Sequence, residues 1–335
     1  METDFKKEIV LNLRGFFLTQ IISTLVKNNS IKIILEKEKF YLNDFKLIKN
    51  KKNLSYLFNY LSNIGYFKNE DNFYSLTEIG RDVLMRYSSF LVPHSYNNYL
   101  LNLDKLLLKK KNNLKIDRDE NILGSGKTHM RYFFTALNYL KKKNKFKSLI
   151  DIGIGNGDFA IIANQMLSLN KICGVDLSTR SVKTSKKKLA KLKIKNLIIK
   201  NDASKIQNWS KKIHNFNLEN NLLISMWFLI QEISLGIKSN VTNYLNSIKR
   251  SFPKAKIILC ELIRTKSEIY SSNKDFSFMP EYMFFHDLSG QKVFEYEALE
   301  GIIKNSNLKI EKKFIFDKLI YKKKIIPSCV IYILK

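Results

Sequence analysis

Short apolar runs alternate with helix-like stretches through the second half of the chain. Five runs have the length and composition of buried strands, at residues 148–152, 171–176, 196–200, 221–226 and 256–262. After these come a long loop expected at 264–291, a helix-like stretch at 296–305, and two more strand-like runs at 308–316 and 329–334. Because parallel strands are buried on both faces, such runs separated by helices predict an α/β, Rossmann-like domain over residues 146–335, with a largely parallel seven-stranded sheet.

The first 90 residues have a different pattern. Apolar residues between Leu11 and Lys27 recur at helical spacing, and a second helix is expected near 54–64. Two short strands beside the polar turn at 69–72 predict a hairpin, and Thr77 is placed to cap the next helix. Helices followed by a hairpin resemble a winged helix, which implies an α+β domain over residues 1–90. Such a domain binds DNA or forms a dimer, and we favour the dimer because the helix at 11–25 is too apolar for water.

Residues 91–145 are expected to connect the two domains through an apolar helix at 96–108, a polar loop and a helix at 130–142. The loop contains Gly-Ser-Gly-Lys-Thr at 124–128. The first glycine of a phosphate loop is replaced by Asn121, so we expect no nucleoside triphosphate site there. His129, Arg131 and Tyr132 follow this loop and can reach toward the substrate cleft. Arg131 and Tyr132 are candidate substrate-binding residues, with Arg131 as a carboxylate clamp.

Three glycines at alternate positions, Gly153, Gly155 and Gly157, follow the first apolar run of the sheet. Glycines at a strand-to-helix turn permit positive φ and bring free backbone N–H groups close to a ligand. A dinucleotide fingerprint would need another glycine where Asp158 stands. With Asp151 closing the strand, the pattern instead resembles motif I of the class I S-adenosylmethionine-dependent methyltransferases, whose cofactor has no phosphate.

The next two apolar runs of the sheet lead to the carboxylates of Asp176 and Asp202. Asp176 stands 21 residues after Gly155, and a carboxylate there can accept hydrogen bonds from both ribose hydroxyls, as in dinucleotide folds. The resemblance implies that Asp202 binds the adenine amino group. It also implies that the cofactor touches Leu177, Ala203 and Ser225.

Two segments carry a resemblance to a narrower group. One follows the fourth strand and contains Trp227, Gln231 and Glu232; the other, in the loop after the fifth strand, contains His286. Plant-type O-methyltransferases have a proton-abstracting His near the position of Gln231, and an amide cannot act as a general base. Together the segments look like the 2-oxo-acid C-methyltransferases of the 2-ketoarginine and phenylpyruvate type, and like related polyketide-pathway enzymes.

This resemblance implies C-methylation of a 2-oxo acid or a carrier-bound acyl group. His286, Gln231 and Glu232 become the candidate catalytic residues, with Trp227 beside the substrate. Several such relatives hold one divalent metal or iron that stabilises an enolate, and His286 and Gln231 are the candidate ligands here. Small-molecule O-methylation is the alternative. The remaining histidines are expected at the surface: His94, His129 and His214.

Composition adds a second alternative, a nucleic-acid-binding protein or an RNA methyltransferase. The chain has 58 Lys and Arg against 30 Asp and Glu, a net charge of +28. The excess is mostly lysine, and Asn and Ile are also abundant, so we attribute it to an AT-rich coding sequence. The three widely spaced cysteines predict buried thiols in a reducing cytoplasm. With no uninterrupted apolar run of membrane-span length and no signal peptide, we expect a cytoplasmic homodimer without membrane contact.

Overall fold

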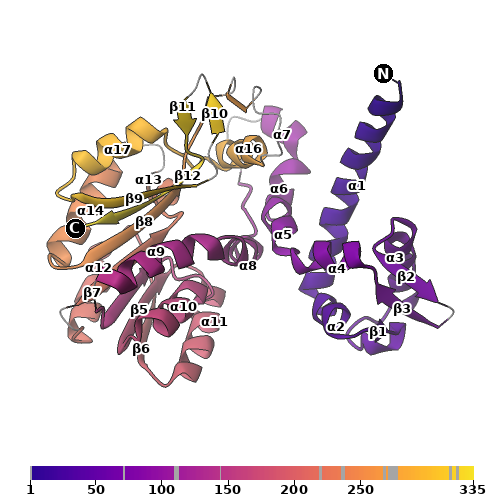
Figure 1. Cartoon of the computed structure of the whole chain (residues 1–335), viewed down its shortest axis with the longest axis horizontal. Helices are drawn as coiled ribbons and strands as arrows, with labels where there is room; N and C mark the ends of the chain where they lie inside the picture. Colours follow the sequence, from indigo (N-terminus) through magenta and orange to yellow (C-terminus); the bar gives the residue numbers. More distant parts are fainter. Residues whose placement is uncertain are drawn as a thin grey trace.

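A sheet flanked by helices is joined through a run of short helices to a smaller N-terminal domain (Figure 1). The structure is a computed structural model. It describes residues 2–70, 72–108, 113–143, 145–218, 221–234, 238–266, 269–270, 278–316, 319–321 and 324–335.

The N-terminal domain consists of helices around a small antiparallel sheet of strand order β1-β3-β2. The hairpin is where the sequence predicts it, and the Thr77 side chain accepts a hydrogen bond from the Gly80 N–H, as expected of a helix cap. The elements are α1 (Glu2–Lys27), α2 (Ser30–Glu36), β1 (Lys39–Phe40), η1 (Leu42–Asp44), α3 (Lys51–Asn63), β2 (Phe67–Glu70), β3 (Phe73–Leu76) and α4 (Glu78–Met85).

Helix α1 is only partly covered. Near its end, Leu18, Ile22 and Leu25 pack into the aromatic core of the domain. Its first half extends away from the domain (Figure 1) and exposes a series of large apolar side chains: Phe5, Ile9, Val10, Leu11, Leu13, Phe16 and Phe17. In the described part of the chain, Phe5–Lys27 is the one stretch long and apolar enough to cross a membrane by length and composition. The sequence predicts a helix over part of this stretch, but no span of membrane length was expected there, because Arg14 interrupts the apolar run.

The connecting region is more helical than predicted. It contains α5 (Ser88–His94), α6 (Asn97–Leu100), α7 (Leu103–Leu108), α8 (Arg118–Thr128) and α9 (Met130–Lys143). The single helix expected at 96–108 is therefore broken, and the loop expected before residue 130 contains helix α8. Asp117 caps α8 by accepting a hydrogen bond from the Glu120 N–H at 3.1 Å. Gly124 lies where α8 crosses α5, and an added Cβ would be 3.0 Å from Leu91 Cβ.

The large domain contains a seven-stranded sheet of order β6-β5-β4-β7-β8-β12-β9, in which β12 runs antiparallel to both neighbours. The prediction of its seven strands is confirmed, each within two residues. The strands are β4 (Ser148–Ile152), β5 (Lys171–Asp176), β6 (Lys195–Lys200), β7 (Leu222–Trp227), β8 (Lys256–Leu262), β9 (Ile310–Phe316) and β12 (Cys329–Leu334), and β10 (Leu319–Tyr321) with β11 (Lys324–Ile326) forms a separate hairpin.

Helices cover both faces of this sheet (Figure 1). They are α10 (Asp158–Leu167), α11 (Thr179–Leu189), η2 (Ala190–Leu192), α12 (Ile206–Asn215), α13 (Ile230–Ser234), α14 (Lys238–Ser251), α16 (Met279–Ser289) and α17 (Tyr296–Lys304). Helix α16 lies within the stretch at 264–291 that was expected to be a loop.

The central strand β4 is buried along its whole length. Ile150 and Ile152 belong to the apolar cluster on one face, while Leu149 belongs to the cluster on the other. Phe133 and Leu137 of α9 pack into that second cluster, so the last helix of the connecting region is part of the core of the sheet domain. The cysteines are free and buried, as predicted.

Candidate cofactor and acceptor site

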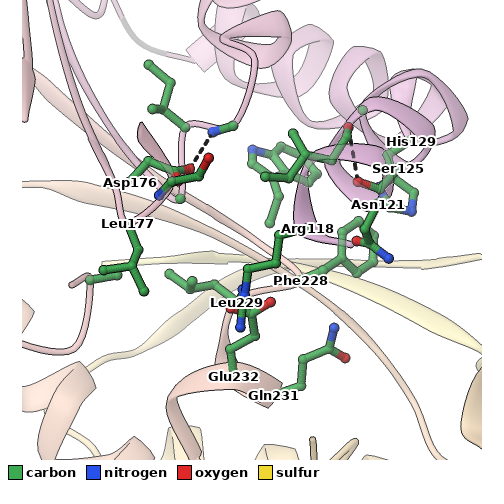
Figure 2. A pocket seen from close by; sticks show the side chains of 18 of the residues that line it. Arg118, Asn121, Ser125, His129, Asp176, Leu177, Phe228, Leu229, Gln231 and Glu232 are labelled. Atoms are coloured by element: carbon green, nitrogen blue, oxygen red, sulfur yellow. Dashed lines mark hydrogen bonds and ion pairs between the residues drawn. The ribbon is translucent and has the colours of Figure 1, made fainter. Parts of the chain in front are cut away.

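A cavity of about 370 Å³ lies at the carboxyl ends of β4, β5 and β7. In open α/β sheets, ligands bind at this edge. Its lining comes from the glycine turn after β4, from the ends of β5 and β6, from α8, and from the segments that carry Gln231 and His286. Figure 2 shows Asp176 and Leu177 on one side and Asn121, Ser125 and His129 of the α8 wall on the other.

The glycine turn has the backbone that its sequence predicts. Gly153, Gly155 and Gly157 have φ values of 75°, 53° and 79°, which L side chains rarely adopt. Gly153 and Gly155 line the cavity, whereas Gly157 precedes the first residue of α10 and is not among the lining residues. A Cβ on Gly155 would lie 3.2 Å from Ile122 Cγ2 of α8. The turn is thus held between its own strand and the α8 wall.

Asp176 lines the cavity with a carboxylate that the backbone fixes in place (Figure 2). Oδ2 accepts a hydrogen bond from the Gly155 N–H and Oδ1 accepts one from the Ser178 N–H, each at 2.8 Å. Burial raises the pKa of Asp176, and these two bonds oppose that shift. Each carboxylate oxygen keeps acceptor capacity for a further donor.

Asp151 sits at the base of the cavity and is 1% exposed. The Ser225 hydroxyl donates to it at 2.6 Å, and burial raises the pKa of Asp151 to about 7. Ser225 is not among the lining residues, so it holds Asp151 from below rather than facing a ligand. Asp202 and Ala203 do line the cavity, after the end of β6.

His286, which the sequence assigns to the methyl acceptor, is 1% exposed and lines the cavity. Its Nδ1 lies 2.7 Å from the Tyr282 carbonyl oxygen, so Nδ1 carries the proton and Nε2 is left as an acceptor. Burial lowers the pKa of His286 to about 4. Two other lining atoms, Gln231 Oε1 and Trp227 Nε1, are buried without a hydrogen-bond partner in the described part of the structure.

The Glu232 carboxylate accepts hydrogen bonds from two side chains that line the cavity. Arg118 of α8 donates to Oε2 at 2.8 Å, and the Gln291 amide donates to Oε1 at 3.2 Å. The carboxylate of Glu232 raises the pKa of the Arg118 guanidinium. Figure 2 shows Arg118 extending between Asp176 and Glu232. Sequence reasoning missed Arg118, although the Asp117-x-x-Glu120 pattern is a helix-start signal that would have placed it on a helix.

Glu261 of β8 is a second residue that the sequence did not reveal. It is 3% exposed, and its Oε1 accepts hydrogen bonds from the N–H groups of Leu229 at 2.9 Å and Ile230 at 2.8 Å. Phe228 just before them has a φ of 53°, which turns the chain sharply out of β7. Burial raises the pKa of Glu261 to about 8. Glu261 therefore fixes the turn that carries Gln231 into the cavity.

For several single residues the structure differs from the expectation. Arg131 and Tyr132 are not among the residues that line the cavity. Arg131 instead donates to the Tyr132 hydroxyl at 2.8 Å, and Tyr132 is 4% exposed within the core. His129 lines the cavity against Phe228, with 4.0 Å between ring centroids, and burial lowers its pKa to about 3. His94 is also largely buried, whereas His214 is exposed as expected.

The side chains present do not fit a resident metal. Within the described ranges, no group of three or more His, Cys, Asp and Glu side chains could hold a metal ion. His286 and Gln231 lie in the same cavity, but two ligands hold a metal poorly. We therefore derive no catalytic step from a metal.

The charge of the cavity is opposite to that of the chain. Among the described lining residues there is one guanidinium, from Arg118, and no lysine. Five carboxylates line the same space: Asp151, Asp158, Asp176, Asp202 and Glu232. In a protein of net charge +28, the described lining of this cavity therefore carries more acidic than basic side chains. Such a cavity favours a cationic ligand over an anionic one.

Comparison with known proteins adds to this picture. No model of a known protein family matches the sequence, and no curated protein matches it either. Solved structures do match. Human N-acetylserotonin methyltransferase in complex with S-adenosylmethionine is similar with a TM-score of 0.63 over 98% of this chain and 97% of that one, at 11% sequence identity.

Two further solved structures extend the match. A putative O-methyltransferase from Nostoc punctiforme has a TM-score of 0.61, with 98% of each chain covered and 15% identity. The mitomycin 7-O-methyltransferase MmcR has a TM-score of 0.59 over 100% of this chain and 98% of that one, at 10% identity. At such identities the likeness shows the fold. Over its whole length, N-terminal domain included, the chain has the fold of these methyltransferases.

Proposed function

We propose that the chain is an S-adenosylmethionine-dependent methyltransferase that acts on a small molecule. The observation that carries the proposal is the acidic cavity at a glycine turn, in a strongly basic protein of this fold. S-adenosylmethionine has a sulfonium and an ammonium group, and its ribose offers two hydroxyl donors. Carboxylates such as Asp151 and Asp176 satisfy both needs.

Each part of the cofactor has a partner among the lining residues. The bare backbone of Gly153 and Gly155 admits the methionine end closely. The fixed carboxylate of Asp176 suits the ribose hydroxyls, with Leu177 as an apolar contact. We assign Asp202 and Ala203 to the adenine, because both line the cavity after the end of β6. When bound, the cofactor supplies an electrophilic methyl group.

O-methylation is the reaction we favour, in place of C-methylation of a 2-oxo acid. The C-methylation hypothesis relied on a metal to stabilise an enolate, and the side chains for that metal are not gathered in the described cavity. Two of the neighbours named above are described as O-methyltransferases. A hydroxyl group that receives the methyl group must lose its proton. The neutral imidazole of His286 accepts that proton as the methyl group transfers, because at a pKa of about 4 it is too weak a base to remove the proton beforehand.

The residues that line the cavity then have separate roles in the reaction. His286 Nε2 accepts the proton of the acceptor hydroxyl, because Nδ1–H is committed to the Tyr282 carbonyl. Gln231 Oε1 and Trp227 Nε1 orient the methyl acceptor, because neither buried atom has a hydrogen-bond partner among the residues that the structure describes. Phe133 and Phe228 supply apolar walls that keep water from the transferring methyl group.

A nucleic acid is the weaker candidate as acceptor. The lining carboxylates would repel phosphates that approach the methyl donor. The lysines of the chain lie outside the described cavity lining, so the net charge of +28 does not describe the site.

Substitution of Asp176 tests the cofactor assignment. Asp176→Ala removes a charged hydrogen-bond acceptor and should weaken binding of S-adenosylhomocysteine by about 1–3 kcal/mol, as measured by calorimetric titration. Asp82→Ala is the control, since Asp82 is an exposed carboxylate of the N-terminal domain. Equal affinities for wild type and Asp176→Ala would refute the ribose assignment, and no binding by wild type would refute the function.

A further inference from the structure

A buried carboxylate joins the N-terminal domain to the wall of the cavity. Glu120 of α8 is 5% exposed and points toward α1 and α5. The Ser23 hydroxyl of α1 donates to Oε1, and His94 Nδ1 of α5 contacts Oε2 at 2.8 Å. Lys27, in the last turn of α1, lies 3.1 Å from Oε2. Three side chains from two helices therefore converge on one residue of α8.

A serine, a histidine and a glutamate suggest a hydrolytic triad, but the geometry differs. In a triad the imidazole stands between the other two groups, with one ring nitrogen for each. Here His94 Nδ1 faces both Ser23 and Glu120, and Nε2 faces Gln20 at 3.1 Å. Neither Ser23 nor His94 lines the described cavity. The cluster therefore holds helices together rather than attacking a substrate.

We propose that Glu120 is a positioning residue, through which α1 and α5 set the place of α8 and thereby the affinity of the cavity for its cofactor. This inference rests on the proposed function. It assigns the N-terminal domain a part in cofactor binding in addition to any part in association.

The opposite side of α8 is what connects this cluster to the ligand. Arg118, Asn121 and Ser125 stand on the cavity side of the helix. Ile122 packs against the backbone of Gly155, and Asp119 accepts a hydrogen bond from the Ser178 hydroxyl at 3.3 Å. Gly155 and Ser178 are the two residues whose N–H groups hold Asp176. A shift of α8 would therefore reach the ribose-binding carboxylate.

Hydrogen bonds from its neighbours keep the buried Glu120 carboxylate charged and in place. Burial disfavours its charged form, but hydrogen bonds from His94 and Ser23 outweigh that effect and lower the pKa of Glu120 below its ordinary value. Removing the carboxylate would leave the buried Ser23 hydroxyl and the largely buried His94 imidazole without this acceptor, whereas Lys27 is half exposed to water. The helices must then move to resolvate those groups, and α8 moves with them.

The test compares Glu120→Ala, Glu120→Gln and Ser23→Ala with wild type in S-adenosylhomocysteine affinity and in amide hydrogen exchange of α8. Glu120→Ala should weaken binding roughly tenfold, since a distant misplacement of a site wall has effects of that order. It should also speed exchange in α8. Glu120→Gln keeps one acceptor oxygen and should recover part of both effects. Because Ser23 and Glu120 share one bond, the double variant Ser23→Ala/Glu120→Ala should lose less than the sum of the single losses.

Glu300→Gln is the matched control. Glu300 is a partly buried carboxylate of α17 that pairs with Lys313 at 2.6 Å and does not line the cavity. Glu300→Gln should change neither the S-adenosylhomocysteine affinity nor the amide exchange of α8. If Glu120→Ala folds and keeps the wild-type S-adenosylhomocysteine affinity and α8 exchange rate, the inference is overturned. If Glu120→Ala does not fold, wild-type values of both quantities in Ser23→Ala would overturn it. If wild type binds no S-adenosylhomocysteine, the proposed function fails, while α8 exchange still decides whether Glu120 positions the helix.

Discussion

Burial sets the protonation state of the side chain that we expect to accept a proton. His286 is enclosed by aromatic residues and donates Nδ1–H to a carbonyl, so its imidazole stays neutral and Nε2 is left as an acceptor. Its pKa of about 4 lies below the ordinary value of 6.5. Between these two values the unfolded chain binds a proton at this residue and the folded chain does not.

This difference predicts the pH dependence of stability. The contribution of neutral His286 is fully present above pH 6.5 and is lost as the pH falls toward about 4. Relative to His286→Gln, wild type should lose up to about 3 kcal/mol of unfolding free energy over that range, at 1.36 kcal/mol per pKa unit. Urea unfolding at several pH values measures it. His214→Gln, at an exposed histidine, should follow wild type; parallel curves for His286→Gln and wild type would contradict the prediction.

Among the elements, α8 matters most to the site, because it contacts the glycine turn on one side and α1 and α5 on the other. Its approach to α5 depends on a missing side chain. A Cβ on Gly124 would lie 2.9 Å from Val92 Cγ2 and 3.0 Å from the Ser88 carbonyl oxygen. Backbone cannot yield as a flexible side chain can, so the helices must separate.

Gly124→Ala should therefore destabilise the protein by about 1–3 kcal/mol, despite the better helix propensity of alanine. It should also weaken S-adenosylhomocysteine binding, because α8 carries the cavity wall. Gly301→Ala is the control: Gly301 is in α17 with nothing within 4 Å of an added Cβ, and alanine there should stabilise by about 0.5–1 kcal/mol. Thermal unfolding and titration of both variants measure this. If Gly124→Ala matched Gly301→Ala in both stability and S-adenosylhomocysteine affinity, α5 and α8 would have room to adjust.

At the scale of the whole molecule, α1 leaves an apolar surface open. Phe16 and Phe17 are 54% and 51% exposed, and Leu13 is 56% exposed on the same helix. Such a continuous apolar surface marks an interaction site. A second copy can cover it by pairing the same helix about a twofold axis, which is the commonest arrangement of soluble oligomers.

We therefore expect a homodimer in sedimentation experiments, and Leu13→Glu should shift it to the monomer by placing a charge in the apolar contact. Ile79→Glu is the control, because Ile79 is 65% exposed on α4 and lies outside α1. A monomeric wild type would refute the dimer. Partition of wild type, but not Leu13→Glu, with lipid vesicles would assign α1 to a membrane surface instead.

The sequence by itself determined the sheet domain and the cofactor turn. Short, mainly apolar runs identify strands such as β4, because parallel strands are buried on both faces whatever their neighbours are. The positive φ values of Gly153 and Gly155 follow from residue type and spacing, since few other residues adopt them. Asp176 is at the ligand edge because a residue that ends a parallel strand must be there.

Only the tertiary structure decided which other side chains reach the cavity. Arg131 and Arg118 look alike in sequence, yet α9 turns Arg131 onto Tyr132 whereas α8 directs Arg118 to Glu232. Glu261 and Glu120 are ordinary carboxylates in sequence, and their importance comes from donors that other elements bring to them. The physical reason is that burial, hydrogen-bond partners and pKa belong to the packing between distant segments, whereas strand periodicity and glycine conformation are local properties of the chain.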